Sequence, residues 1–155
     1  MSTPNPHHHQ GLFTGLHHGK VDEKNRVTIP AAWRSDELES QSYLAIFHPA
    51  VGSVIVFPPA MVARIAEAAR QVAISDPAKV DAMTTLGENS IEVSCDRTGR
   101  ITLNDRIVTQ ANLGREVIFS GAFTTFHIRG QNPPRPDRDS PQTRAILEAL
   151  RQLGL

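Results

Sequence analysis

The sequence predicts an α+β protein built mainly from β-strands, in which two tandem copies of one small β unit share a core. Helices are expected between the two halves and at the C-terminal end. Two observations predict this class: a short motif occurs twice, nearly half the chain apart, and similar elements follow each copy. With 155 residues, of which 39% are hydrophobic and 21% charged, the chain suits a packed globular core.

The duplicated motif occupies residues 22–30 and residues 96–104, and both copies carry Asp, Arg and Thr at equivalent positions. Asn25 stands opposite Gly99, and both residue types tolerate the left-handed backbone region. The aspartate at the start of each copy can accept backbone N–H bonds, and the alternating residues that follow are typical of a strand. The sequence therefore predicts a tight turn followed by a strand in each half.

Each motif is followed by the same series of elements. Pro30 is expected to open a short helical turn over residues 31–38, and Asn104 to cap a helix within residues 105–114. β-Branched and aromatic residues then predict two strands in each half, at residues 43–47 and 53–57 and at residues 116–120 and 124–128. A unit of this size is marginal alone, so each half is expected to bury its apolar face against the other.

Helical segments separate and follow the two halves. Pro58 and Pro59 are expected to open one helix, and Ser75 to cap a second helix that ends near Gly87. A last helix at residues 143–153 carries an apolar stripe. The expected organisation is a disordered His-rich tail at 1–11, a first repeat at 12–58, a helical insert at 59–89, a second repeat at 90–130, and a Pro-rich linker with the C-terminal helix at 131–155.

The two motifs, with Phe13-Thr14-Gly15 before the first and residues 114–121 after the second, resemble the MraZ family of transcriptional regulators. That family belongs to the wider AbrB-like swapped-hairpin group, and the resemblance covers about residues 12–130. It implies two tandem AbrB-like swapped-hairpin units that form a pseudo-symmetric β-barrel. It also implies a ring of such chains, with the motif turns facing direct repeats upstream of the division and cell-wall gene cluster.

The chain departs from the family pattern at several positions. Asn25 stands where glycine is common, Asn104 where proline is usual, and Thr98 where a polar or basic residue often stands. The insert between the halves carries only Lys79 as a basic residue over residues 78–89. These differences concern the affinity for DNA and the target sequence rather than the fold.

Residues of the motifs and their flanks are the candidates for contacting DNA: Lys20, Asp22, Lys24, Arg26, Arg34, Arg97, Arg100 and Arg106. The motif arginines would contact phosphates or base edges while the motif aspartates orient them. The alternative is that each arginine pairs with its own aspartate and stiffens the turn.

The flanking basic residues would complete a basic patch, or form ordinary solvated surface. Lys20, Lys24 and Arg34 flank the first motif, whereas Arg97 and Arg106 hold comparable places in the second half. The first half is favoured as the main DNA surface because it holds more lysine near its turn.

The overall charge limits the DNA hypothesis. The chain has 16 basic and 16 acidic residues, whereas nucleic-acid-binding proteins usually carry a basic excess. Repetition of the site in a homo-oligomeric ring would compensate, because linked sites gain affinity through their effective concentration. The expected partners are therefore double-stranded DNA and further copies of the chain, with no membrane and no small-molecule substrate.

A cytoplasmic, nucleoid-associated protein is expected. The N-terminal residues lack the charged start and apolar stretch of a secretory signal. No apolar run reaches the roughly 20 residues that a membrane-spanning helix needs. The single cysteine, Cys95, fits a reducing compartment.

Neither catalysis nor a cofactor is expected. Asp96 would raise the pKa of the neighbouring Cys95 thiol, and no nucleophile elbow or phosphate-binding glycine loop occurs. The histidines at 7–9 and 17–18 could ligate zinc or nickel, but a solvated tail is favoured over a metal site. His48 and His127 are expected to be structural or surface residues.

Three functional hypotheses follow. The favoured one is a sequence-specific DNA-binding transcriptional regulator, a repressor that binds promoter direct repeats and competes with RNA polymerase. The alternative is an oligomeric β-barrel scaffold that has lost DNA binding and holds a protein partner through its C-terminal helix. A third is a nickel or zinc carrier that uses the His-rich tail.

Overall fold

The computed structural model describes residues 12–34 and 42–155, which form eight strands, four α-helices and one 3-10 turn. The strands are β1 Leu16–Lys20, β2 Arg26–Thr28, β3 Ser42–His48, β4 Ser53–Phe57, β5 Ser90–Ser94, β6 Arg100–Thr102, β7 Glu116–Gly121 and β8 Phe126–Gly130. The helical elements are η1 Ala31–Trp33, α1 Pro59–Arg70, α2 Pro77–Glu88, α3 Asp105–Gln110 and α4 Pro141–Gln152. The α+β class with a majority of strands is confirmed.

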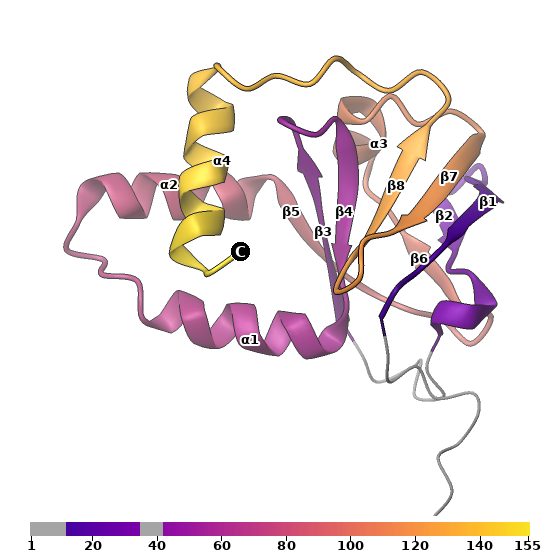
Figure 1. The fold of residues 1–155 in the computed structure, drawn as a ribbon, viewed down its shortest axis with the longest axis horizontal. Helices are drawn as coiled ribbons and strands as arrows, with labels where there is room; N and C mark the ends of the chain where they lie inside the picture. Colours follow the sequence, from indigo (N-terminus) through magenta and orange to yellow (C-terminus); the bar gives the residue numbers. More distant parts are fainter. Residues whose placement is uncertain (1–11, 35–41) are drawn as a thin grey trace, which may run out of the picture.

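The two halves of the chain exchange strands. One antiparallel sheet has the order β1-β7-β8-β4-β3-β5, and β2 pairs with β6 in a separate two-stranded ribbon (Figure 1). The first strand of each half lies against the other half, because β1 pairs with β7 and β5 pairs with β3. The ribbon likewise takes one strand from each half. Neither half therefore has a complete sheet of its own.

The expected closed barrel is not formed by the described residues. The hydrogen-bonded sheet ends at β1 on one side and at β5 on the other. An isolated bridge between Val21 and Val27 joins β1 to the ribbon. The physical reason is that β2 and β6 are three residues long and pair with each other, so the short ribbon packs across the sheet without continuing its hydrogen-bond ladder. The assignment of each half to the AbrB-like class stays a prediction.

The main core lies between the sheet and the ribbon. Val27 and Ile101 of the ribbon have no exposed surface, and neither has Phe126 on β8. Trp33 of η1 packs on Phe126 with ring centroids 5.2 Å apart, and its indole nitrogen donates a hydrogen bond to the Thr14 carbonyl over 3.1 Å. Because Trp33 and Phe126 come from different halves, this core joins the halves.

A second core lies on the other face of the sheet, where α1, α2 and α4 cover β3 and β4 (Figure 1). Ile46 and Phe57 of the sheet pack there with Leu86 of α2 and with Ile146 and Leu150 of α4. The apolar stripe predicted for the C-terminal helix is therefore buried against the same chain. This contradicts the premise of the scaffold hypothesis, in which that stripe would hold a protein partner.

The helix ends follow local capping rules, with one correction. Asn104 caps α3 as predicted, because its side-chain oxygen accepts the Ile107 N–H over 2.8 Å. The prediction that Ser75 caps α2 is wrong, because Asp76 accepts the Ala78 N–H over 3.1 Å. Pro77 takes the first helical position, which makes the residue directly before it the cap. The predicted tail at 1–11 and residues 35–38 of the predicted helical turn lie outside the described residues.

Candidate nucleic-acid interface

The two motifs meet in the β2–β6 ribbon, which has an apolar face and a polar face. Val27 lies opposite Ile101 in the pairing register, and both face the core. The remaining positions point the other way, because successive side chains on a strand alternate between faces. They are Arg26, Thr28, Arg100 and Thr102. The register places Arg26 beside Thr102 and Arg100 beside Thr28, so each arginine adjoins a threonine of the other half.

Each ribbon strand is preceded by the predicted tight turn. In the first turn, Asp22 Oδ1 accepts the N–H groups of Lys24 and Arg26, both over 2.9 Å. Asn25 has a φ of 60°, the left-handed conformation that the sequence predicts. The second turn repeats this geometry around Asp96, with a φ of 84° at Gly99. The two turns lie at opposite ends of the ribbon, because its strands are antiparallel.

The motif arginines pair with their own aspartates. Arg26 Nε lies 2.6 Å from Asp22 Oδ2, and Arg100 Nε lies 2.8 Å from Asp96 Oδ2. The four side chains are between 32% and 41% exposed. A guanidinium that pairs through Nε can still donate from its terminal nitrogens to a phosphate or a base edge. The stiffened turn and the DNA-contacting arginine are therefore compatible interpretations of one arrangement.

Hydrogen bonding keeps both motif aspartates ionised. The backbone N–H of Arg26 is the largest cause that lowers the pKa of Asp22 below its usual range. The backbone N–H of Arg100 likewise holds the pKa of Asp96 well below its usual range. A carboxylate that stays charged near neutral pH can fix the orientation of its arginine. The ionised aspartates therefore favour the guanidinium positions in which Arg26 and Arg100 pair with them.

Each turn also contacts a side chain of the other half. Asn25 Nδ2 donates to Asp105 Oδ1 over 2.6 Å, so α3 of the second half lies on the first turn. Arg34 Nη1 donates to the Thr98 carbonyl over 3.0 Å, so Arg34, directly after η1, lies on the second turn. Arg34 flanks the first motif in the sequence, yet the structure places it at the second. Strand exchange between the halves causes this difference.

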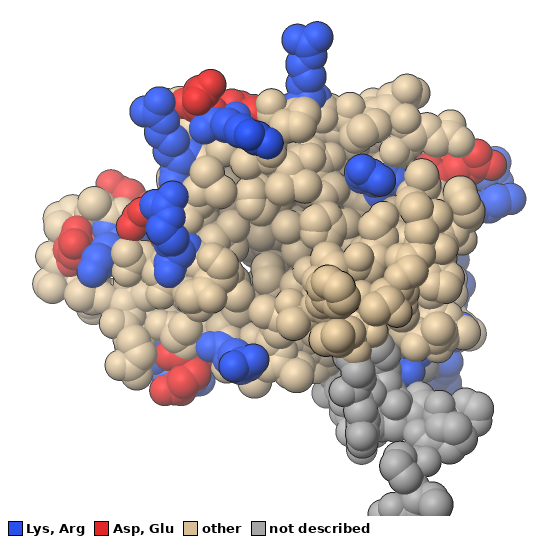
Figure 2. Space-filling model, in the orientation of Figure 1, with Lys and Arg blue, Asp and Glu red and all other residues tan. Residues whose placement is uncertain are grey.

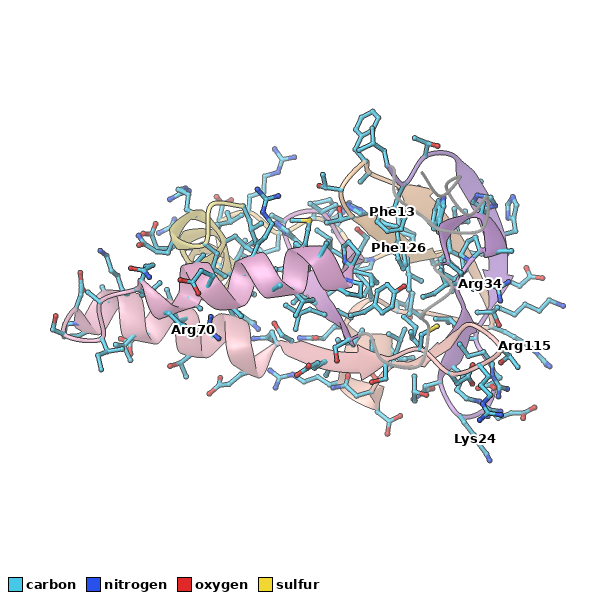
Figure 3. All side chains as sticks on the ribbon, turned by 90° about the horizontal axis from the view of Figure 1, so that it is seen from below. Phe13, Lys24, Arg34, Arg70, Arg115 and Phe126 are labelled. Carbon is cyan, nitrogen blue, oxygen red and sulfur yellow. The ribbon has the colours of Figure 1, made fainter. Side chains whose placement is uncertain are left out.

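The other candidate residues lie in different surroundings. Lys24 is exposed at the first turn and Arg97 at the second. Arg106 is turned away from the turns, since its guanidinium donates to the Glu88 carbonyl and to Asn89 Oδ1 at the end of α2. Figure 3 shows Lys24, Arg34 and Arg115 at the end of the molecule that carries the ribbon, and Arg70 at the opposite end.

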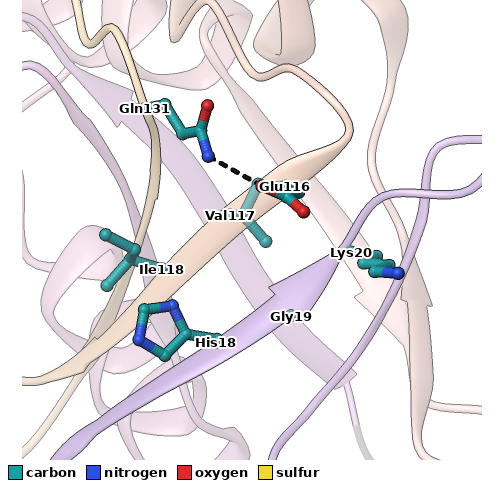
Figure 4. A pocket seen from close by; sticks show the side chains of 7 residues that line it. All are labelled: His18, Gly19, Lys20, Glu116, Val117, Ile118 and Gln131. Atoms are coloured by element: carbon teal, nitrogen blue, oxygen red, sulfur yellow. Dashed lines mark hydrogen bonds between the residues drawn. The ribbon is translucent and has the colours of Figure 1, made fainter.

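Lys20 lies beside an acidic residue. Its register partner on β7 is Glu116, which also accepts a hydrogen bond from Gln131 Nε2 over 2.7 Å. These three residues and His18 line a shallow surface pocket between β1 and the end of β8 (Figure 4). Lys20 therefore lies across from an acidic residue in the six-stranded sheet and not on the ribbon.

Three residues on or near this surface were missing from the sequence-based candidates. Thr28 and Thr102 lie on the polar face of the ribbon, and the period-two alternation of the motif could have identified them. Arg115 lies beside the first turn, because its carbonyl oxygen accepts the Val21 N–H over 2.8 Å. No local signal in the sequence connects Arg115 with that turn.

Replacing Gly99 with alanine is expected to destabilise the protein by about 1 to 2 kcal/mol, since an L side chain in the left-handed region costs that amount. The new Cβ would also lie 2.4 Å from Cδ of Arg34, which would have to move. Gly87→Ala is the matched control, because Gly87 lies in α2 with open space where the methyl group would go, and alanine there gains up to about 1 kcal/mol. Urea denaturation measures the free energy of unfolding, which is expected to fall in Gly99→Ala and to rise in Gly87→Ala. A stabilised Gly99→Ala would contradict the turn geometry.

The histidines do not form a metal site in the described residues. His17 packs edge-on against Trp33 with centroids 4.9 Å apart, whereas the next residue, His18, faces the surface pocket. Residues 12–34 and 42–155 contain no group of three or more His, Cys, Asp or Glu placed to hold a metal ion. His7–His9, the core of the carrier hypothesis, lie outside the described residues.

The two isolated histidines and the cysteine lie in protected surroundings. His127 Nδ1 lies 3.0 Å from Ser53 Oγ, and burial lowers the pKa of both His48 and His127. Cys95 is buried, and burial, followed by the Asp96 charge, raises the pKa of its thiol to about 11. A thiol with this pKa is protonated at neutral pH and is a poor nucleophile.

The face that carries α1 and α4 does not resemble a nucleic-acid-binding surface. Figure 2 shows basic side chains interspersed with acidic ones on this face. Phosphate binding favours a clustered basic surface instead.

None of the helices in the described part of the chain combines the length and the hydropathy needed to cross a membrane.

Comparison with known proteins relates this chain to named transcriptional regulators. It is 34% identical over 117 residues to the transcriptional regulator MraZ of Frankia alni, which covers 76% of this chain and 80% of that protein. The MraZ protein of Frankia casuarinae shows the same identity and coverage. The MraZ protein of Gluconacetobacter diazotrophicus is 29% identical over 149 residues, or 92% of this chain and 94% of its own length. No family model matches the chain.

Proposed function

The chain belongs to the MraZ family of transcriptional regulators, and from this we propose that it binds promoter DNA in a sequence-specific manner and represses transcription. The observation that carries the proposal is the polar face of the β2–β6 ribbon. It presents Arg26 and Arg100 together, each oriented by an ionised aspartate. Such an arrangement suits recognition of phosphates and of guanine edges by the planar guanidinium group.

The ribbon has dimensions suited to a DNA groove. A two-stranded β-ribbon fits the major groove, which is about 12 Å wide. Strands of three residues span roughly 10 Å, so the turns at the two ends of the ribbon would reach the phosphates on either side. Arg26, Arg100 and their neighbouring threonines would then face the base edges, while Lys24 and Arg97 contact the backbone.

We further propose that several copies act together. A homo-oligomeric ring would present many ribbons to direct repeats upstream of the division and cell-wall gene cluster, and would exclude RNA polymerase from the promoter. Linked sites raise the effective concentration of each ribbon at its repeat. We propose a division into repeats at 12–58 and 90–130 around the insert at 59–89. Each chain of the ring would then carry one ribbon, with β2 from its first repeat and β6 from its second. The protein would act in the cytoplasm on the nucleoid, without a cofactor or catalysis.

The test is fluorescence anisotropy of the full-length protein on the DNA upstream of its own gene, across a salt series. Wild-type protein is expected to prefer the intact repeats over a scrambled duplex and to lose affinity steeply with salt. Arg26→Ala is expected to weaken binding by about fivefold to a hundredfold, since a good arginine contact contributes about 1 to 3 kcal/mol.

Arg70→Ala is the matched control for this experiment. Arg70 is exposed at the far end of α1, pairs with Glu67 and lies away from the ribbon (Figure 3). Its replacement is expected to leave the affinity within twofold of wild type. A folded wild-type protein that fails to bind either duplex at low salt would refute the proposed function.

A further inference from the structure

The first turn of the ribbon contains an asparagine in a backbone conformation that glycine adopts more easily. Asn25 has a φ of 60°, and its side chain donates to Asp105 Oδ1 at the start of α3 over 2.6 Å. We propose that Asp105 is a positioning residue that holds this turn, and with it Arg26, in the geometry that binds DNA. The inference rests on the proposed function and deepens it, because it gives a role to a residue that lies 80 positions from Asn25 in the sequence.

The left-handed conformation of Asn25 is one that other contacts must support. A side chain on an L residue disfavours this region, although asparagine tolerates it better than most residues do. A residue stays there when the surrounding structure fixes it from several sides. The backbone of Asn25 is fixed at two points, since its N–H donates to the Asp22 carbonyl over 3.0 Å and its carbonyl accepts the Leu103 N–H over 2.9 Å. The side-chain bond to Asp105 is the third point.

The second turn has the same backbone bonds without this side-chain bond. Gly99 holds the equivalent position with a φ of 84°, which glycine adopts without steric cost. Its N–H donates to the Asp96 carbonyl over 3.0 Å, and its carbonyl accepts the Ile29 N–H over 2.8 Å. Glycine has no side chain that a neighbour could bind. The Asn25–Asp105 bond is therefore specific to the first turn, and the second turn serves as its reference.

Asp105 can hold the turn because α3 is itself held in place. Ile107, two residues after Asp105, is 1% exposed and packs in the main core. On another side of the helix, Arg106 Nη2 and Gln110 Nε2 each donate to Asn89 Oδ1 over 3.1 Å. Asn89 is 4% exposed and follows α2 directly. The first turn is thus bound to a helix that is fixed both to the core and to the helical insert.

The conformation of Asn25 affects Arg26, the next residue in the chain. Asp22 binds the Arg26 N–H over 2.9 Å and the Arg26 Nε over 2.6 Å. A change of backbone angle at Asn25 would rotate the peptide group that carries the Arg26 N–H, because a peptide group is planar and turns as a unit. Loss of the Asn25–Asp105 bond is therefore expected to lower the fraction of molecules in which Arg26 is oriented for DNA. The apparent affinity falls in proportion to that fraction.

Amide hydrogen exchange tests the positioning role without DNA. Asp105→Ala removes the acceptor of the Asn25 side chain, whereas Asp105→Asn removes the charge and keeps an oxygen that can accept the same bond. The amides of Lys24 and Arg26 donate to the aspartate of the first turn, so their exchange rates report on that turn. These rates are expected to rise several-fold in Asp105→Ala and to stay within twofold of wild type in Asp105→Asn.

The second turn is the internal control for the exchange experiment. The amides of Thr98 and Arg100 make the equivalent bonds to Asp96, each over 2.9 Å, and their exchange is expected to stay the same in both variants. Asn25→Gly provides a rescue, because glycine keeps a positive φ without a side-chain bond. Adding Asp105→Ala to Asn25→Gly is therefore expected to cause no further increase in exchange at the first turn. Equal exchange rates in Asp105→Ala and Asp105→Asn, or a further increase in the Asn25→Gly background, would overturn the inference.

The salt-series assay on the upstream DNA connects the Asn25–Asp105 bond with binding. Asp105→Ala is expected to bind about twofold to tenfold more weakly than Asp105→Asn, the factor that one hydrogen bond contributes. Both variants lack the carboxylate, so this difference does not arise from charge. It is expected to disappear when Arg26→Ala is added to each variant and to remain when Arg100→Ala is added, because residues that act together are not additive.

The outcomes separate this inference from the proposed function. A purely structural role for Asp105 would give the same difference in affinity in the Arg26→Ala and Arg100→Ala backgrounds. That result would overturn the inference while wild-type binding still supports the proposed function. Absence of wild-type binding would refute the proposed function, and the positioning of Arg26 for DNA with it.

Discussion

Replacing Phe126 with alanine is expected to lower the free energy of unfolding by about 3 to 5 kcal/mol, the usual cost of removing a buried aromatic ring. Phe126 on β8 has no exposed surface. Its ring lies 5.3 Å from that of Phe13, 5.2 Å from that of Trp33 and 6.2 Å from that of Phe119. The loss should be large because these rings come from both halves, so the cavity would lie in the core that holds the halves together.

Phe123→Ala provides the matched control for this prediction. Phe123 lies three residues earlier, in the turn between β7 and β8, where its side chain is 63% exposed and its φ is 66°. The same substitution there should change stability by no more than about 0.5 kcal/mol. Urea denaturation monitored by Trp33 fluorescence measures both variants. Equal losses in the free energy of unfolding of the two variants would contradict the placement of Phe126 in the core.

Replacing Ile146 with alanine is expected to cost about 2 to 5 kcal/mol, the range for truncating a buried aliphatic side chain. Ile146 of α4 is 1% exposed and packs in the second core with Ile46 and Leu86. Alanine has the higher helix propensity, which offsets only a few tenths of a kcal/mol. The prediction tests whether α4 is part of the folded core of its own chain.

Leu155→Ala is the control for this second prediction, because Leu155 follows the same helix and is 41% exposed. It is expected to stay within about 0.5 kcal/mol of wild type. Chemical denaturation of both variants provides the comparison. A stability loss of less than about 1 kcal/mol in Ile146→Ala would show that α4 leaves the core in solution, and the apolar stripe would again be available to a protein partner.

The local elements of this protein could be predicted from its sequence because short-range interactions determine them. The left-handed residues at Asn25 and Gly99, the aspartate hydrogen bonds in both turns and the cap at Asn104 all involve residues within four positions of each other. The cap of α2 was the exception. Two polar residues, Ser75 and Asp76, precede Pro77, and Asp76 rather than Ser75 is the cap.

The composition of the candidate interface was only partly predictable. Arg26 and Arg100 were identified because the duplicated motif contains them. Thr28 and Thr102 were overlooked, although strand alternation places them on the same face as the arginines. Arg106 resembled a flanking residue of the second motif, yet its guanidinium binds the end of α2. Charge and proximity in sequence do not show where a long side chain is directed.

Sequence patterns were sufficient to predict the tight turn in each motif, and the aspartate and arginine that pair within it. The strand order, the open sheet and the side chain that lies on each turn became known only from the three-dimensional arrangement of the chain. Arg34 and Thr98 are 64 residues apart, and Asn25 and Asp105 are 80 residues apart. Such contacts arise because the halves exchange strands, and exchange depends on how two apolar faces bury each other rather than on any local pattern.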